Sequence, residues 1–202
     1  MGQVGIRVES LRARRKPESL ARLKQAARKL FVERGYDATR PQDIAREAGL
    51  GHGTFYLHYA DKRACFLSFV DDARRELDAH LRDRRRGATL EERIAVTLEA
   101  MYDYADRHPG LLRAALTDAR VIDAEGEEIR PLMNQWGEEW AKVIGEAVAE
   151  GSARNGYDTG IIGQAIVGAL YQTGCEAQHA GRSRETLVAN LTIFLSRALR
   201  PD

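Results

Sequence analysis

The sequence of 202 residues predicts an all-α protein with about nine helices. Apolar residues recur at helical spacing along almost the whole chain, and no window alternates apolar and polar residues as a half-buried strand does. The expected organisation is a basic N-terminal arm with a three-helix domain in residues 1–62, joined by a long fourth helix to a helical domain in residues 63–202.

Charge is distributed unevenly along the chain. Residues 1–60 contain 12 Lys and Arg against 6 Asp and Glu, a net charge of +6, whereas residues 61–202 contain 19 against 24, a net charge of −5. This polarity indicates that the N-terminal part faces a polyanion.

Several protein classes are excluded by the composition. No segment has the roughly 18 apolar residues of a membrane span, and no signal-peptide h-region stands before a small-residue cleavage site, so we expect a cytoplasmic protein. Cys65 and Cys175 form no CxxC pair or Cys/His cluster, which argues against a disulfide framework and a zinc site. We expect no metal and no cofactor.

The first helix is expected to begin near Pro17 and to end at Gly35, which can adopt the left-handed conformation of a helix C-cap. It carries an apolar stripe formed by Leu20, Leu23, Ala27, Leu30 and Phe31. The basic lead-in, Arg12–Lys16, is either an arm that enters the minor groove of DNA or a disordered solubilising tail, and both readings stay open.

Two short helices follow, at about residues 40–48 and 53–58, separated by a glycine-containing turn. Thr39 and Gln42 are expected to form a capping box, with Pro41 at the first helical position. A short helix, a tight turn and a second helix packed on an earlier helix are typical of a helix-turn-helix, which lays its last helix in the DNA major groove. The outward residues are expected to be His52, Gly53, Thr54, Tyr56, Leu57 and His58.

The fourth helix is expected to start at Asp61 and to link the two domains. Further helices are predicted at about residues 89–107, 110–119, 128–153, 159–180 and 184–199.

Residues 20–66 resemble the DNA-binding region of TetR-type transcriptional repressors. The motifs that carry the resemblance are Ala26-Ala27-x-x-Leu30-Phe31-x-x-x-Gly35, Asp43-Ile44-Ala45, Ala48-Gly49, Gly53-Thr54-Phe55-Tyr56-x-His58 and Asp61-Lys62. The resemblance implies that bases and backbone are contacted by Gln42, His52, Gly53, Thr54 and Tyr56, and that Lys62 holds a phosphate. Arg40 stands where the family usually has a hydroxyl residue, so we expect it to add a phosphate contact.

The resemblance further implies a sensing domain with a small-molecule cavity, and dimerisation through the last two helices. The candidates for the cavity are Met101, Tyr104, Leu111, Leu112, Trp136, Trp140 and Tyr171, although such stripes are often ordinary core. Candidates for the dimer interface are Ile166, Leu170, Leu187, Leu191, Phe194 and Leu195.

No catalytic motif is present, and His80 and His179 have no Cys or acidic partner at ligand spacing along the chain. The sequence therefore predicts a regulator, not an enzyme: a homodimeric repressor that binds a palindromic operator in double-stranded DNA and is released by a small hydrophobic or aromatic effector. One alternative is a constitutive DNA-binding activator or architectural protein. Another is a helical interaction or enzymatic domain with a vestigial DNA-binding head.

Overall fold

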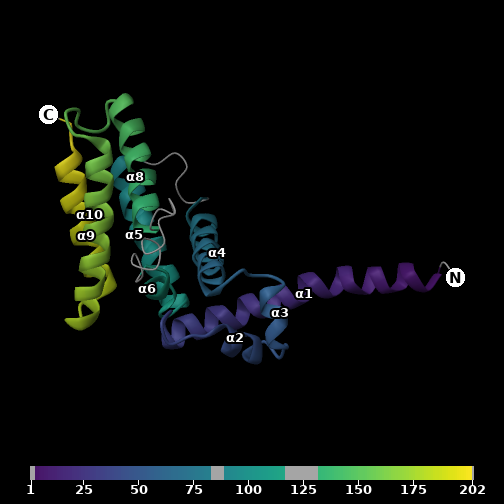
Figure 1. Cartoon of the computed structure of the whole chain (residues 1–202). Coiled ribbons are helices and arrows are strands. Elements are labelled where there is room, and N and C mark those ends of the chain that lie inside the picture. Colours follow the sequence, from purple (N-terminus) through teal and green to yellow (C-terminus); the bar gives the residue numbers. More distant parts are fainter. Residues whose placement is uncertain (1–2, 83–88, 117–131, 202) are drawn as a thin grey trace. The chain divides into compact units, whose positions relative to one another are not determined.

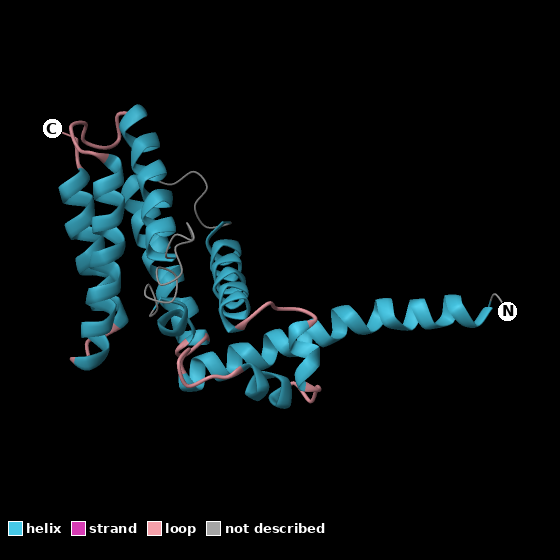
Figure 2. Cartoon of the chain, viewed as in Figure 1, coloured by secondary structure: helices cyan, strands magenta, loops and turns pink. Residues whose placement is uncertain are grey.

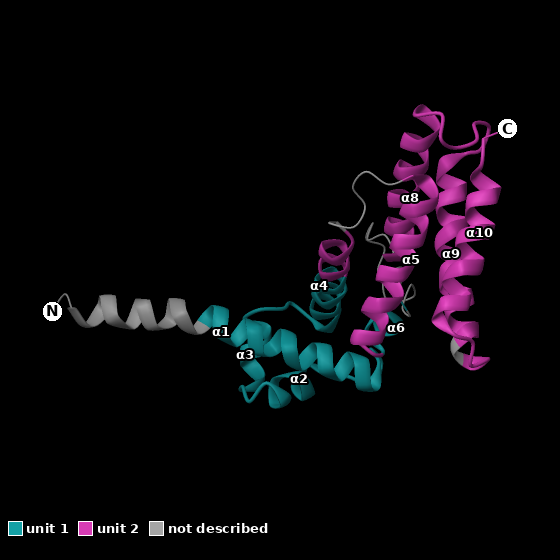
Figure 3. Ribbon diagram, turned by 180° about the vertical axis from the view of Figure 1, so that it is seen from behind, with its two compact units in different colours: residues 1–73, 110–121 teal, residues 74–109, 122–202 magenta. Residues whose placement is uncertain are grey.

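The computed structural model describes residues 3–82, 89–116 and 132–201, with side chains for all of these except positions 3–15, 82 and 178. This part of the chain contains nine helices and no strand, which confirms the all-α prediction (Figure 1, Figure 2). The chain divides into two compact units, residues 1–73 with 110–121 and residues 74–109 with 122–202 (Figure 3). The division falls after Ala73, later in the chain than the boundary expected after residue 62.

The first unit contains the three N-terminal helices, the first half of α4, and α6. Their bounds are α1 (Gln3–Arg34), α2 (Pro41–Glu47), α3 (His52–Tyr56), α4 (Lys62–Arg82) and α6 (Leu111–Leu116). α1 begins earlier than predicted, and Pro17 lies inside it. Residues 3–16 contain four Arg together with single Leu, Ala, Glu, Gln and Lys residues, all of which favour helix, whereas the prediction placed the helix start at the proline.

Aromatic side chains form the core of the first unit. The Phe31 ring on α1 lies 5.1 Å from the Phe66 ring and 5.6 Å from the Phe69 ring, both on α4, measured between centroids. Tyr36 follows Gly35, which ends α1 at φ +79° as predicted, and its ring lies 5.0 Å from that of Phe66. These contacts hold the start of α4 against α1.

α6 packs on α1, so a segment distant in sequence joins the N-terminal unit. Leu111 is 1% exposed. Gly110 has φ +78°, and a side-chain carbon placed on it would lie 3.1 Å from the Val32 side chain of α1. The close approach of α6 to α1 therefore favours glycine at this position.

The second unit consists of the end of α4 and four further helices: α5 (Leu90–Arg107), α8 (Leu132–Ala149), α9 (Thr159–His179) and α10 (Arg184–Leu199). Thr89 begins α5 with a capping box shared with Glu92. The side chains of Asp158 and Ser183 cap α9 and α10. Predicted and observed bounds agree closely for α5, α9 and α10. The predicted end at residue 119 and the predicted start at residue 128 lie outside the described residues.

α8 and α9 pack along each other at very short range. A side-chain carbon on Gly163 would overlap the backbone carbonyl oxygen of Gly137 and lie 2.8 Å from the backbone nitrogen of Ala141. Only a residue without a side chain fits at Gly163, so this glycine allows the two helices to approach closely. α10 packs against α5, where the Arg184 guanidinium donates to the Glu99 carbonyl oxygen at 3.0 Å. None of the helices in the described residues has the length and hydropathy that crossing a bilayer requires.

Candidate nucleic-acid interface

α2, a tight turn and α3 form a rigid pair. Gly49 occupies the left-handed region at φ +63°, and the Leu50 N–H donates to the Ala45 carbonyl oxygen at 2.8 Å. Ile44 and Phe55 are both fully buried between the helices. The turn and this small core fix how α3 lies against α2, as the sequence analysis predicts.

The solvent-facing side of α3 carries most of the expected contact residues. His52, Gly53 and Tyr56 are exposed, and Thr54 is half-buried. The His52 ring meets the Tyr56 ring edge to face, with 5.1 Å between centroids. This pair of rings orders the exposed face of α3 without help from a ligand.

The start of α2 differs from the expectation. Arg40 is the N-cap residue and makes no side-chain cap hydrogen bond, while Pro41 is the first helical residue as predicted. The predicted capping box is wrong: Thr39 is fully buried, and its hydroxyl donates to the Gly35 carbonyl oxygen at 2.7 Å. A carbonyl at the end of α1 needs a donor, and Thr39 supplies it. Gln42 is exposed, and it takes no part in a capping box. Its side-chain amide is therefore available for contact with a DNA base.

Lys62 opens α4 and is half-buried. Its ammonium group donates to the Tyr36 carbonyl oxygen at 3.0 Å and lies 4.0 Å from the centre of the Tyr36 ring. An ammonium group has three donors, so this hydrogen bond leaves donors for a phosphate.

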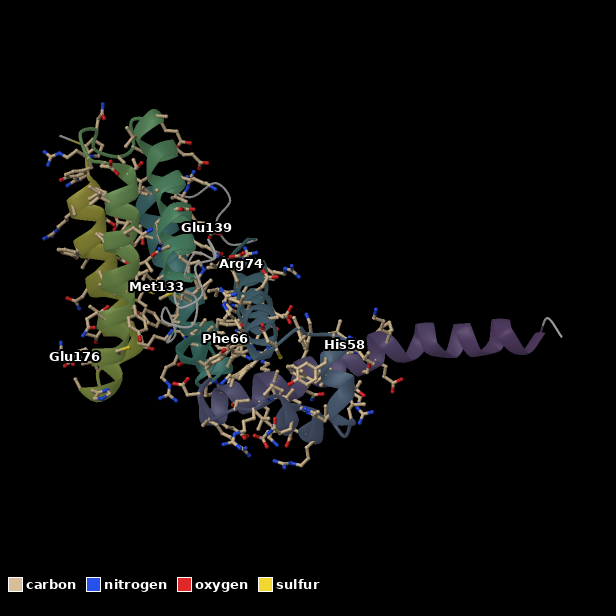
Figure 4. All side chains as sticks on the ribbon, in the orientation of Figure 1. His58, Phe66, Arg74, Met133, Glu139 and Glu176 are labelled. Carbon is tan, nitrogen blue, oxygen red and sulfur yellow. The ribbon has the colours of Figure 1, made fainter. Side chains whose placement is uncertain are left out.

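His58, the second residue after α3, is labelled in Figure 4. It departs from the expected outward set because it is half-buried. Its Nε2 lies 2.8 Å from the Ser19 hydroxyl oxygen on α1. Burial, with a smaller contribution from the charge of Lys16, lowers the pKa of His58 below its usual value. His58 therefore ties α3 to α1, a role that depends on two residues far apart in sequence.

Several other side chains hold the helices of the first unit together. Lys24 on α1 forms an ion pair with Asp72 on α4 at 2.7 Å, and Lys29 on α1 pairs with Glu47 on α2 at 2.6 Å. The hydrogen bond with Glu47 raises the pKa of Lys29. Arg22 donates to the Gly49 carbonyl oxygen at 3.1 Å, which joins α1 to the turn before α3.

The predicted effector residues fall in both units. Met101 and Tyr104 lie on α5, Trp136 and Trp140 on α8, and Tyr171 on α9, all in the second unit. Leu111 and Leu112 lie on α6, in the first unit. The Tyr104 hydroxyl donates to the Glu76 carboxylate at 2.8 Å, and both Trp side chains are buried.

Sequence spacing does not reveal the polar links of the second unit. His80 near the end of α4 lies 3.2 Å from the Asp103 carboxylate on α5, a partner 23 positions away. Tyr102, which is not among the residues predicted for the effector site, donates to the Leu170 carbonyl oxygen at 3.3 Å, and burial raises its pKa. No group of three or more potential metal ligands occurs within the described ranges.

Of the predicted interface residues, Ile166, Leu170, Leu191 and Leu195 are buried within the protomer. Leu187 is half-buried, and Phe194 is 63% exposed. The other large apolar side chains exposed on α9 and α10 are Ile161 and Ile193.

Comparison with known proteins places the N-terminal domain in a family. Residues 23–69 match the family model described as bacterial regulatory proteins of the tetR family. The uncharacterized HTH-type regulator YerO of Bacillus subtilis is 28% identical over 96 residues, 44% of this chain and 33% of YerO. The fatty acid metabolism regulator protein of B. subtilis is 22% identical over 150 residues, 73% of this chain and 77% of the relative.

A solved structure shows the same fold over most of the chain. The regulator FadR of B. subtilis, in complex with stearoyl-CoA, has a TM-score of 0.71 at 20% identity, covering 88% of this chain and 97% of the other. Residues 23–69 therefore have the helix-turn-helix of the tetR family of bacterial regulatory proteins, and the chain as a whole shares the fold of FadR. The prediction of a regulator and not an enzyme is confirmed by these relatives.

Proposed function

We propose that this protein is a homodimeric repressor that binds a palindromic operator and is released by a small hydrophobic or aromatic effector. The observation that carries the proposal is the exposed, ordered face of α3 on a turn fixed by Gly49. Palindromy follows from a two-fold dimer, because two copies of α3 then meet half-sites about one DNA turn apart, ~34–36 Å.

The DNA contacts are divided by chemistry. Arg40, Thr54, Tyr56 and Lys62 offer donors suited to phosphate oxygens, and Gly53 lets a DNA backbone approach closely. Gln42 and His52 are exposed and are assigned to base edges, since glutamine pairs best with adenine.

The proposed dimer interface is the exposed stripe of α9 and α10. Its members on α9 recur every three or four residues: Ile161, Ala165, Gly168, Gln172 and Cys175. On α10, Ile193 and Phe194 are exposed by 49% and 63%. Large apolar side chains exposed on adjacent helices favour coverage by another protein surface. Four of the predicted interface residues would pack beneath this stripe within the protomer: Ile166, Leu170, Leu191 and Leu195. Leu187, which is half-buried, would lie at the edge of the stripe.

The effector is assigned to the second unit, around Trp136, Trp140 and Tyr171 with Met101 and Tyr104. Apolar and aromatic side chains with a few polar groups are typical of small-molecule sites. The relative solved with stearoyl-CoA supports a hydrophobic effector. α4 contributes residues to both units, so an effector that shifts the end of α4 can act on DNA binding. Such release requires that the effector prefers one state by several kcal/mol.

The test uses fluorescence anisotropy with duplexes selected from a randomised pool, together with native mass spectrometry of gently purified protein. We expect a dimer mass, a palindromic selected site and a log K that falls against log salt with a slope of about −0.9 per phosphate contact. A retained small molecule, or a panel compound that weakens binding, supports the repressor. DNA binding that no compound alters would support a constitutive activator or architectural protein. The absence of salt-dependent DNA binding would support a helical interaction or enzymatic domain with a vestigial DNA-binding head.

A further inference from the structure

We propose that Leu57 recognises thymine, by packing against the C5-methyl group in the major groove. The inference deepens the proposed function and rests on it, because it assumes that α3 enters DNA. Leu57 is 73% exposed, more than any other large apolar side chain in the described part of the chain.

The backbone places Leu57 on the face of α3 that carries the expected contacts. Leu57 is the C-cap residue but keeps helical angles, φ −75° and ψ −17°, and its N–H donates to the Thr54 carbonyl oxygen at 3.3 Å. It therefore stands one helical turn after Gly53. Helical side chains point toward the preceding turn, so the leucine lies on the side of Gly53.

Gly53 leaves the space in front of Leu57 open. A side-chain carbon built on Gly53 would have no atom within 4 Å. On the same face, the Tyr56 ring is held between His52 at 5.1 Å and Phe55 at 5.3 Å, measured between centroids. The exposed Leu57 side chain therefore has open space over Gly53, one turn before it, which a methyl group on a base edge can occupy.

The positive charge of the N-terminal part of the chain indicates what kind of partner covers Leu57. Residues 1–60 carry a net charge of +6, and Lys16 lies close enough to His58 to lower its pKa. An anionic partner that also presents an apolar group suits these surroundings. Among the base edges of the major groove, the apolar group is the thymine methyl. An apolar protein surface would be met by a larger contiguous patch than a single leucine beside a glycine.

The test removes one methyl group from the DNA. A duplex is selected with the wild-type protein, and each thymine is then replaced singly by deoxyuridine, which lacks only that group. We expect one thymine in each half-site whose replacement weakens wild-type binding about fourfold, as for the loss of one buried methyl. Leu57→Ala should bind the thymine and uracil duplexes equally, within about twofold, and Leu57→Met should keep the preference.

The salt dependence measured in the same titrations distinguishes failure of the Leu57 assignment from failure of the proposed DNA binding. An exposed leucine contributes little to folding, so Leu57→Ala should keep the wild-type salt slope and thermal midpoint. A wild-type protein that binds DNA with a normal salt slope but ignores every uracil replacement overturns the Leu57 assignment alone. The same holds if Leu57→Ala retains the thymine preference. A wild-type protein with no salt-dependent binding overturns both proposals.

Discussion

The Lys62 ammonium lies 3.0 Å from the Tyr36 carbonyl oxygen and 4.0 Å from the centre of the Tyr36 ring. The hydrogen bond and the cation–π contact tie the first residue of α4 to the turn that follows α1. They also hold the ammonium group in place before any DNA phosphate arrives. A preplaced cation loses less side-chain freedom on binding, which increases its net contribution to affinity.

Replacement of Lys62 by alanine should weaken DNA binding about tenfold or more at low salt, because a charge-assisted hydrogen bond to phosphate is lost. The loss should be similar for all sequences, and the salt slope should become shallower by about one per protomer. Anisotropy titrations at several salt concentrations measure both. Lys142→Ala, at an exposed position on α8, is the matched control and should change neither. An unchanged slope in the Lys62 variant would remove this residue from the phosphate contacts.

Replacement of Gln42 by alanine should alter base preference instead of general affinity. Gln42 is exposed at the start of α2, and the Thr39 hydroxyl is bonded to the end of α1, so no capping box restrains the amide. We expect a loss of about 1–3 kcal/mol at one base position per half-site and little change elsewhere. Repeating the duplex selection with the variant reveals the position. Equal losses at all positions would contradict base reading by Gln42.

The stability of the first unit should depend on pH through His58. Because the pKa of His58 is lowered in the folded protein, the unfolded chain binds the proton more readily. Stability is therefore full above the unfolded pKa of about 6.5 and falls as pH decreases through that value. Thermal midpoints of the wild type and His58→Gln should be compared at pH 8 and pH 5.5. The variant should lose less stability on acidification, and parallel profiles would refute this role.

The α8–α9 contact should not tolerate a side chain at Gly163. Gly163→Ala places a carbon against the backbone carbonyl of Gly137, and neither helix can move without disturbing its packing, so we expect a loss of about 1–3 kcal/mol or more. Gly145→Ala on α8 is the control, since its added carbon meets no atom within 4 Å and should stabilise by about 0.5–1 kcal/mol. Urea unfolding at fixed protein concentration measures both. Similar effects for the two variants would contradict the close contact.

A charge on the exposed stripe of α10 should disrupt the proposed dimer. Phe194→Glu puts a carboxylate where the wild type has a side chain 63% exposed, so folding of the protomer should survive while association is lost. Native mass spectrometry and light scattering should report a monomer, and operator binding should weaken strongly. Lys142→Glu on α8 tests whether an added carboxylate alone has this effect. A Phe194→Glu variant that stays dimeric would place the interface elsewhere.

Much of the fold follows from local patterns in the sequence. The observed bounds of α5, α9 and α10 lie within a residue or two of the predicted ones, because capping residues and glycines mark helix ends locally. The helix-turn-helix was predictable for the same reason, since its turn needs Gly49 at positive φ and its core needs an apolar residue on each short helix, Ile44 on α2 and Phe55 on α3.

Other features of the site were not predictable from local patterns. Thr39 has the spacing of a capping box, yet it bonds to the end of α1, because a buried hydroxyl takes the nearest unsatisfied carbonyl. His58 pairs with Ser19, and His80 with Asp103, over separations that no motif encodes. The apolar residues expected at a dimer interface are largely buried within the protomer, since one helix has several apolar faces and the sequence does not say which neighbour covers each.

The sequence alone determined the helical class, the ends of α5, α9 and α10 and the DNA-binding motif, because each depends on interactions between residues a few positions apart. The tertiary structure alone decided which side chains tie α1 to α3 and α4, that α6 joins the N-terminal unit, and which apolar residues of α9 and α10 remain exposed. These features depend on which helices pack together, and packing is a property of the whole chain that periodicity within one helix cannot specify.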